Sequence, residues 1–323
     1  MESPAEEKRQ HRPAWKRILR WGVPVLIGLL LIVWALNGSR AGTRIEGCAD
    51  GCSTAAPRRE GPLRVMSANV LHDFPRFRRL AQRLEMVAAE IRRQDADIVC
   101  LQEVPWTLRL GSGIEYLARQ TGMNYLYLRA DGNRHTILFE AGDAILSRFP
   151  LHDLAFVELE PRVSYYEHRM ALHATAATPW GDVRVYATHL TSGHPADNPG
   201  QAASLRTFVE STGSGPAIVA GDFNAKEDSA QIQALSKVWL DTYRVANPGE
   251  AGWTCCINDL TAETDTRDGR IDYLFLVPGL DGEESVVSGV RVLDRPVQGL
   301  DGWLWASDHV GLLTNIEMAG PAK

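Results

Sequence analysis

Short apolar runs, each followed by a polar side chain, recur through most of this 323-residue chain. The run from Leu63 to Ala68 alternates as a strand does and is followed by Asn69, and the run from Ile98 to Leu101 leads to Glu103. Other apolar runs end in the same way, at His189, Asp222 and Asn224. Scaffold strands that end in carboxylates, amides and imidazoles usually deliver them to one shared rim. The pattern therefore predicts a sheet protein with a polar site at its strand ends.

A few helical segments are predicted between these strands. Phe77, Leu80, Leu84, Val87 and Ile91 recur at intervals of three and four residues, which places them on one face of a helix. Residues 201–210 and 229–236 are also predicted helices. Further strands are predicted at 125–129, 144–147, 151–159, 168–175, 183–190, 217–220, 270–277 and 310–316. Many strands with a few helices between them predict an α/β layered sandwich.

An uncharged run of 19 residues, from Trp21 to Ser39, precedes this pattern. A helix of about 20 such residues crosses the hydrocarbon core of a bilayer. Six Lys and Arg residues before Trp21 predict that the N-terminus stays in the cytoplasm and that the rest lies outside. We expect a single-pass plasma-membrane protein with a basic tail (1–20), a transmembrane helix (21–39), a Gly- and Ser-containing linker (40–61) and a folded domain (62–318). The alternative is a signal peptide cleaved near Ala41, which would release a secreted domain.

Charge is divided unevenly between these segments. The first 44 residues carry eight Lys and Arg against three Glu, a net charge of +5, and the whole chain is −6, so residues 45–323 sum to −11. Nucleic-acid binding depends mainly on cationic side chains that neutralise phosphates. The acidic domain therefore favours substrates other than polymeric nucleic acid.

Five cysteines fit an exported domain. Cys100 lies in an apolar strand, which is typical of a small buried side chain. The other four, Cys48, Cys52, Cys255 and Cys256, predict two disulfides in an oxidising compartment, with three pairings open. A zinc site is the alternative, although neither cysteine pair has the common spacing of zinc ligands.

Several of the polar residues at strand ends have side chains suited to phosphate chemistry. Glu103 offers a hard oxygen ligand of the kind that Mg²⁺ prefers. Asp222 and Asn224, in Gly221-Asp222-Phe223-Asn224, place a carboxylate and an amide two residues apart after a turn that glycine permits. Taken alone, each of these motifs could also have a purely structural role, such as a turn that caps a strand.

The strongest local signal is the acid and imidazole of Ser307-Asp308-His309. Histidine has a pKa suited to proton transfer near neutrality, and a carboxylate bonded to its second nitrogen fixes its tautomer. Asp272, in Arg270-Ile271-Asp272-Tyr273, lies within an apolar strand and needs a partner. His189 fits either a catalytic or a structural histidine, and Arg169 either binds a phosphate or makes a structural ion pair.

These motifs occur in an order that resembles the endonuclease/exonuclease/phosphatase superfamily. They are Asn69, Gln102-Glu103, Ala144-Ile145-Leu146-Ser147-Arg148, Thr188-His189-Leu190, Gly221-Asp222-Phe223-Asn224, Arg270-Ile271-Asp272-Tyr273 and Ser307-Asp308-His309. The resemblance covers about residues 62–318. It implies a four-layer α/β/β/α sandwich of two sheets with helices outside.

The resemblance also implies roles for single residues. Glu103 is similar to the principal metal carboxylate of the superfamily, with Asn69 and Asp308 near the same Mg²⁺ or Mn²⁺ ion. Asp222 and Asn224 resemble the pair that orients the attacking water and the phosphate. His309 resembles the general base, held by Asp272, although Asp222 remains the alternative base. His189 resembles a second histidine that stabilises phosphate oxygens, with Glu140, Asp143 or neither as its partner.

The sequence thus predicts a metal-dependent hydrolase of phosphoesters, a phosphodiesterase or a phosphatase. The membrane anchor and the acidic domain favour lipid head groups as its substrate, with Arg169 as a residue that contacts substrate. An extracytoplasmic nuclease acting on DNA or RNA is the alternative, and an inactive binding domain on the same fold is a remote one. We expect no obligate protein partner. Trp303 and Trp305 predict either core packing or a loop that touches the membrane.

Overall fold

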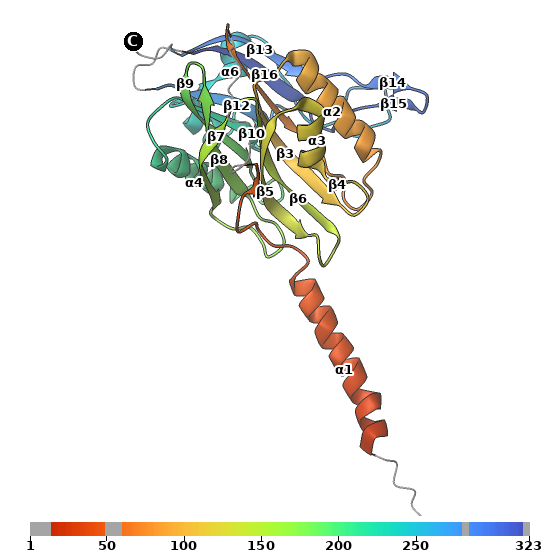
Figure 1. Cartoon of the computed structure of the whole chain (residues 1–323). Coiled ribbons are helices and arrows are strands. Elements are labelled where there is room, and N and C mark those ends of the chain that lie inside the picture. Colours follow the sequence, from red (N-terminus) through yellow and green to blue (C-terminus); the bar gives the residue numbers. More distant parts are fainter. Residues whose placement is uncertain (1–13, 49–59, 280–283, 319–323) are drawn as a thin grey trace, which may run out of the picture. The chain divides into compact units, whose positions relative to one another are not determined.

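The computed structural model describes residues 14–48, 60–279 and 284–318. The chain divides into two compact units, of which the first ends at Gly38 and the second begins at Ser39 (Figure 1). Each unit is described by itself. The basic tail up to residue 13, the part of the predicted linker at 49–59 and the pairing of Cys52 lie outside the described residues.

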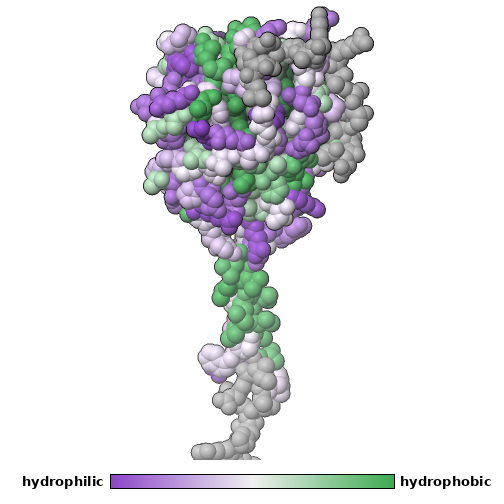
Figure 2. All heavy atoms as spheres, turned by 90° about the vertical axis from the view of Figure 1, so that its left-hand side faces the viewer, coloured by the Kyte–Doolittle hydropathy of each residue, from purple (hydrophilic) through white to green (hydrophobic). Residues whose placement is uncertain are grey.

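The first unit is one helix, α1 (Ala14–Leu36). Its stretch from Leu19 to Leu36 has a mean hydropathy of 2.1, and none of it is buried. Figure 2 shows that apolar residues cover this helix. It is therefore long and apolar enough to cross a membrane, and it also fits a signal sequence. The helix ends at Leu36 instead of continuing to Ser39, because the amides of Asn37 and Gly38 turn back onto the carbonyls of Trp34 and Ala35.

The second unit is built on two sheets and one short hairpin. The first sheet has the strand order β1-β5-β6-β3-β2-β16-β13, with β4 paired to β3, and the second has the order β11-β12-β10-β9-β8-β7. The strands of the first sheet are β1 (Glu46–Gly47), β2 (Leu63–Asn69), β3 (Ile98–Thr107), β4 (Gly111–Ser112), β5 (Asn124–Asn133), β6 (Phe139–Ser147), β13 (Ser285–Val292) and β16 (Gly311–Glu317). Those of the second are β7 (Leu151–Glu158), β8 (Met170–Thr178), β9 (Gly181–His189), β10 (Ala217–Asp222), β11 (Leu240–Asp241) and β12 (Asp272–Val277). The hairpin is β14 (Val297–Gly299) with β15 (Gly302–Leu304).

Side-chain alternation along the strands creates three apolar layers. In β10, Ile218 and Ala220 pack into the core between the two sheets, whereas Ala217 and Val219 face the opposite side. The helices α2 (Leu80–Gln94) and α3 (Gly113–Thr121) cover the outer face of the first sheet. The helices α4 (Asn198–Ser211) and α5 (Ala230–Ser236) cover the outer face of the second. A short helix, α6 (Thr242–Ala246), lies against β13 and β12. The predicted four-layer sandwich is confirmed (Figure 1).

Each sheet contains one parallel pair of strands at its centre. β2 lies parallel to β3, with Asn69 opposite Gln102. β9 lies parallel to β10, with His189 opposite Asp222. Since the carboxyl ends of parallel strands meet at the same edge, each pair delivers its terminal polar residues together. This register explains the polar residues that follow apolar runs in the sequence.

The folded unit begins earlier than the predicted boundary at residue 62. Ser39 accepts a hydrogen bond from the backbone of Gly132 at 2.9 Å, the amide of Gly42 donates to Arg129, and β1 pairs with β5. The predicted linker at 40–61 is therefore wrong over its first part, because residues 39–47 add an edge to the first sheet.

Some helix and strand predictions also differ from the structure. The helix predicted from Phe77 begins at Leu80, because Phe77 and Arg79 have positive φ angles of 50° and 48°. The strand predicted at 270–277 begins at Asp272. The helix α3 and the strand β13 were not predicted. β13 is an edge strand with mostly exposed or half-buried side chains, so it lacks a clear apolar alternation.

The core between the sheets yields a stability prediction. Leu172 is fully buried there, and replacing it with alanine leaves a cavity that costs about 2–5 kcal/mol. Leu172→Ala should lower the unfolding free energy by that amount in denaturant titrations of the full chain in detergent. Leu300→Ala, at an exposed position, is the matched control and should change it little. Equal effects of the two variants would contradict the assigned core.

Candidate active site

A bulge in β3 directs Glu103 into the space between the two sheets. The pairing of β3 with β6 shifts register between Leu101 and Val104, and Glu103 has a φ of 57°. Such bulges re-aim side chains next to functional sites. The carboxylate accepts hydrogen bonds from the Asn69 side chain at 3.2 Å and from the His72 backbone at 3.2 Å. The end of β2 and the bulge inside β3 therefore meet at one carboxylate.

The second sheet contributes Asp222, which contacts groups from both sheets. Its Oδ2 accepts a hydrogen bond from Asn69 Nδ2 at 3.1 Å and lies 3.5 Å from His189 Nε2 and 3.7 Å from His309 Nε2. Asn224, with a φ of 47°, donates from its side chain to the carbonyl of Leu190 and lies 3.0 Å from His189 Nε2. The predicted cluster of Asn69, Asp222, Asn224 and His189 is thus brought together.

His309 connects the two sheets. It precedes β16 of the first sheet, and its Nδ1 lies 2.9 Å from Asp272 Oδ2 at the start of β12 in the second. Both side chains are buried. The other nitrogen of the imidazole, Nε2, lies 3.7 Å from Asp222 Oδ2. His309 therefore bonds Asp272, the carboxylate that the resemblance implies as its partner.

Residues 254–257 form hydrogen bonds to the backbone on either side of this pair. Thr254 Oγ1 accepts from the amide of Asp272 at 3.2 Å, and the carbonyl of Thr254 accepts from the amide of Val310. The amide of Ile257 donates to the carbonyl of Asp308. Cys255 lies between these contacts, with its Sγ 3.5 Å from His309 Nε2.

Of the open cysteine pairings, the structure has Cys255 bonded to Cys256. Cys100 is free and fully buried, as its apolar strand predicts. Burial also raises the pKa of the Cys100 thiol, which keeps it protonated. Trp305 is buried as well and donates its indole N–H to Ala262, so this tryptophan packs inside the unit instead of forming a membrane-contact loop.

A small cavity of about 90 Å³ extends the site beside His189. Asp143, Arg169 and Glu103 also line it. Arg169 forms an ion pair with Glu167 at 3.0 Å, so it both faces the cavity and has a structural partner. Glu140 binds Arg129 and Arg134 and does not line the cavity. Between the two predicted partners of His189, only Asp143 therefore shares its cavity.

Burial and mutual repulsion set the charges in the site. Burial raises the pKa of Asp222 to about 7, and the charge of Asp272 adds to this. Burial lowers the pKa of His309, but Asp272 and Asp222 outweigh it and raise the pKa well above its usual value. Burial together with the nearby Arg169 lowers the pKa of His189 well below its usual value. These shifts favour the protonated form of His309 and the neutral form of His189.

The oxygen donors fit a hard divalent cation. Burial raises the pKa of Asp308, and the charge of Glu103 raises it further, so a cation between them would relieve a real repulsion. Asn69 Oδ1 accepts one hydrogen bond, from Leu71, which leaves a second lone pair. The donors of Asp222, Asp272 and His309 also lie within 4.8 Å of one another. However, His309 Nδ1 and Asp272 Oδ2 already bind each other.

Sequence reasoning missed three residues that shape the site. His72 Nε2 lies 3.4 Å from Glu103 Oε2, and Asp131 lines the small cavity. Arg83 is fully buried in α2 and donates to the carbonyls of Val70 and Ala306, which joins the loops before His72 and before Asp308. His72 was detectable, since it follows Asn69 by three residues. The role of Arg83 depends on a tertiary contact that no local pattern shows.

Comparison with known proteins agrees with this geometry. The sequence pattern of the endonuclease/exonuclease/phosphatase family matches residues 66–309, from β2 to the imidazole of His309. The chain belongs to this family. No curated protein matches the sequence.

Solved structures share the fold of this family member. It is similar to an endonuclease/exonuclease/phosphatase from Beutenbergia cavernae, with 24% identity, a TM-score of 0.61 and coverage of 81% of this chain and 72% of that one. A mannosyl-6-phosphatase from Bacteroides thetaiotaomicron has 19% identity and a TM-score of 0.62, with coverage of 79% and 100%. A truncated TDP2 from Caenorhabditis elegans has 18% identity and a TM-score of 0.60, with coverage of 79% and 96%.

The contact between Asp272 and His309 yields a titration prediction. The carboxylate raises the pKa of His309, so Asp272→Asn should lower that pKa, and the imidazolium should lose its proton at lower pH than in the parent. Selective histidine NMR of the metal-free full chain would measure this. Asp153→Asn, at an exposed position, should leave the titration unchanged. An unchanged or raised pKa in Asp272→Asn would contradict the assigned electrostatics.

Proposed function

We propose that this protein is a divalent-metal-dependent hydrolase of phosphoester bonds that acts on lipid head groups outside the cytoplasm. The observation that carries the proposal is the single cluster in which Glu103, Asp222 and His309 meet across the two sheets, within a chain of the endonuclease/exonuclease/phosphatase family. The mannosyl-6-phosphatase structure with this fold bears a name that fits phosphoester chemistry.

Glu103, Asn69 and Asp308 are the residues that would hold the cation, Mg²⁺ or Mn²⁺. When bound, the cation neutralises charge on the phosphoryl oxygens. The side chains of the second sheet perform the remaining tasks. Asp222 and Asn224 orient the attacking water and the phosphate, and neutral His189 donates a hydrogen bond to a phosphate oxygen. Arg169, on the wall of the same cavity, supplies a positive charge to the substrate.

Proton transfer is assigned to His309, which Asp272 holds in one tautomer. Because Asp272 and Asp222 favour the protonated imidazole, His309 can take a proton from water only after its own proton passes to Asp222, which lies 3.7 Å from its Nε2. The two groups therefore share the proton that leaves the nucleophile, and Asp222 is the alternative acceptor. A base of this kind contributes about 10²–10⁴-fold to the rate. An inactive binding domain is disfavoured, because every acid, amide and imidazole that the chemistry needs is present.

The membrane anchor supports the choice of lipid. α1 ends at Leu36 and the folded unit begins at Ser39, so the connecting backbone spans about 11 Å at full extension. A span in the plasma membrane, with the basic tail inside, would therefore keep the catalytic unit at the outer surface. Such tethering raises the effective concentration of lipid head groups at the site. Cleavage of α1 as a signal sequence would release a secreted enzyme and remove this advantage.

Metal dependence gives the first test of the proposal. The full chain in detergent should hydrolyse bis-p-nitrophenyl phosphate, lose activity with a chelator and regain it with Mg²⁺ or Mn²⁺, because the proposed ligands are oxygens. His309→Ala should lower kcat by about 10²–10⁴-fold and serves as the inactive control. Full activity in excess chelator, or in His309→Ala, would refute the assignment.

Substrate class gives the second test. We expect a higher kcat/KM on vesicles that contain sphingomyelin, phosphatidylglycerol or phosphoinositides than on plasmid DNA at equal Mg²⁺ and moderate salt. The reason is the charge of −11 on residues 45–323, which disfavours a polyanionic duplex. Plasmid nicking with every lipid left intact would show instead that the enzyme is an extracytoplasmic nuclease.

A further inference from the structure

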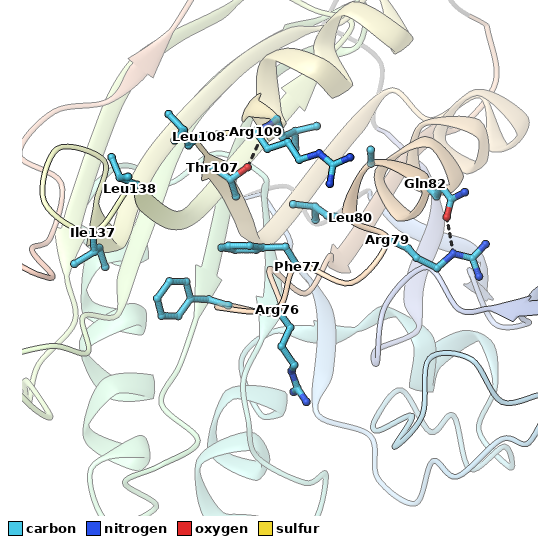
Figure 3. Close-up of a pocket in the computed structure, with 13 residues that line it drawn as sticks. Arg76, Phe77, Arg79, Leu80, Gln82, Thr107, Leu108, Arg109, Ile137 and Leu138 are labelled. Carbon is cyan, nitrogen blue, oxygen red and sulfur yellow. Dashed lines mark hydrogen bonds between the residues drawn. The ribbon is translucent and has the colours of Figure 1, made fainter. Parts of the chain in front are cut away.

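A large apolar pocket lies beside the active site and has no role in the chemistry described above. Its volume is about 750 Å³, within the usual range of small-molecule sites. Three segments surround it: the turn and first helical residues at 74–82, the end of β3 with its turn at 107–110, and the tip of the β5–β6 hairpin at 137–138. Figure 3 shows Ile137 and Leu138 on one side, with Leu108, Phe77 and Leu80 around the same space.

The ring of Phe139 lies near both a pocket residue and a residue that contacts a proposed metal ligand. Phe139 is buried, and its ring lies 5.6 Å from that of Phe77, which lines the pocket. The same ring lies 4.9 Å from that of His72, which contacts Glu103. Thr107 and Glu103 also lie four residues apart on one strand, a distance of about 13 Å. The apolar pocket and the active site are therefore close neighbours along β3.

The rim of the pocket is amphipathic. Phe74, Leu108 and Leu138 are large apolar residues with exposed fractions of 43%, 70% and 48%. Arg76 and Arg109 are exposed beside them, and within the described part of the chain Arg109 has no carboxylate partner. Exposed apolar side chains with interspersed arginines are typical of surfaces that lie in a membrane interface. The positive charges are notable in a unit whose net charge is negative.

The pocket lies at the end of the first sheet where the chain enters from α1. Ser39, the first residue of the folded unit, bonds to Gly132, and the amide of Arg40 donates to the same residue. Gly132 pairs with Glu140, next to Phe139, and Phe139 pairs with Thr107. The attachment point, the hairpin tip and the 107–110 turn therefore share one edge.

We propose that this pocket binds one acyl chain of an anionic phospholipid whose phosphoester lies at the active site. Arg76 and Arg109 contact head-group phosphates, and Phe74, Leu108 and Leu138 enter the outer leaflet. The proposal rests on the proposed phosphoesterase function and makes it specific: the substrate is recognised by its acyl chain as well as by its phosphate. It also assigns the membrane-facing surface to this rim and not to the loop at 299–305.

Photolabelling tests the pocket without requiring turnover. The full chain is reconstituted in phosphatidylcholine vesicles that contain phosphatidylglycerol with a diazirine in one acyl chain. Illumination should label peptides that cover 74–82, 107–110 and 137–138, and labelling of α1 in the same sample is the internal reference. Absence of label from all three segments would overturn the proposal.

Two variants and a matched control sharpen this experiment. Ala81→Trp fills the pocket from an exposed helix position, and Leu108→Glu places a charge on its rim. Each should lower pocket labelling and kcat/KM on lipid by about tenfold or more, as expected when about two CH₂ groups of the acyl chain are no longer buried in the pocket. Hydrolysis of bis-p-nitrophenyl phosphate should stay unchanged, which shows that the variants are folded. Leu300→Glu, on the exposed β14–β15 turn, should change neither quantity.

The outcomes separate this proposal from the proposed function. Pocket labelling in a protein that hydrolyses no phosphoester would support the lipid site and refute the enzyme. Lipid hydrolysis that survives Ala81→Trp and Leu108→Glu but falls in Leu300→Glu would refute the pocket and support the enzyme. Equal pocket labelling by a phosphatidylcholine probe, or by Arg109→Glu and the parent, would refute the preference for an anionic head group.

Discussion

The arrangement of this site depends on the cost of placing several carboxylates in one buried space. Glu103, Asp222, Asp272 and Asp308 converge there, and each buried charge requires a compensating partner. His309 compensates the charge of two of these carboxylates, because Asp272 lies at one of its ring nitrogens and Asp222 at the other. The Asn69 side-chain amide and the His72 backbone amide donate hydrogen bonds to Glu103, and the Asn224 backbone amide donates to Asp222. What remains is a demand for positive charge, which a divalent cation would meet.

Much of this site could be predicted from the sequence, because its residues follow directly from strand ends. Asp222 and His189 terminate neighbouring strands that run in parallel, so the polar residue after each apolar run is carried to the same edge. The order of the short motifs then suggested one family and one fold, and both were confirmed. The pairing of Asp272 with His309 could also be predicted, since an acid inside an apolar strand requires a partner.

The parts that could not be predicted depend on backbone detail or distant contacts. The bulge that directs Glu103 inward has no signature in Leu101-Gln102-Glu103-Val104. Phe77 fits the helical spacing, but its left-handed backbone ends that pattern before Leu80. The residues after Ser39 have the composition of a linker and still form a sheet edge, because their backbone groups pair with β5 regardless of side chain. The apolar pocket gathers three segments that lie far apart in the sequence.

One feature of the fold bears on how such an enzyme would fail. The site lies on the seam between two sheets, and the contacts Asn69–Asp222 and His309–Asp272 both cross it. Neither sheet carries a complete set of groups. A small slide of one sheet over the other, through heat, pressure or a repacked core residue, would separate acid from imidazole while both sheets stayed intact. The activity of such an enzyme would therefore depend on the alignment of the two sheets, and it would be lost before the secondary structure unfolds.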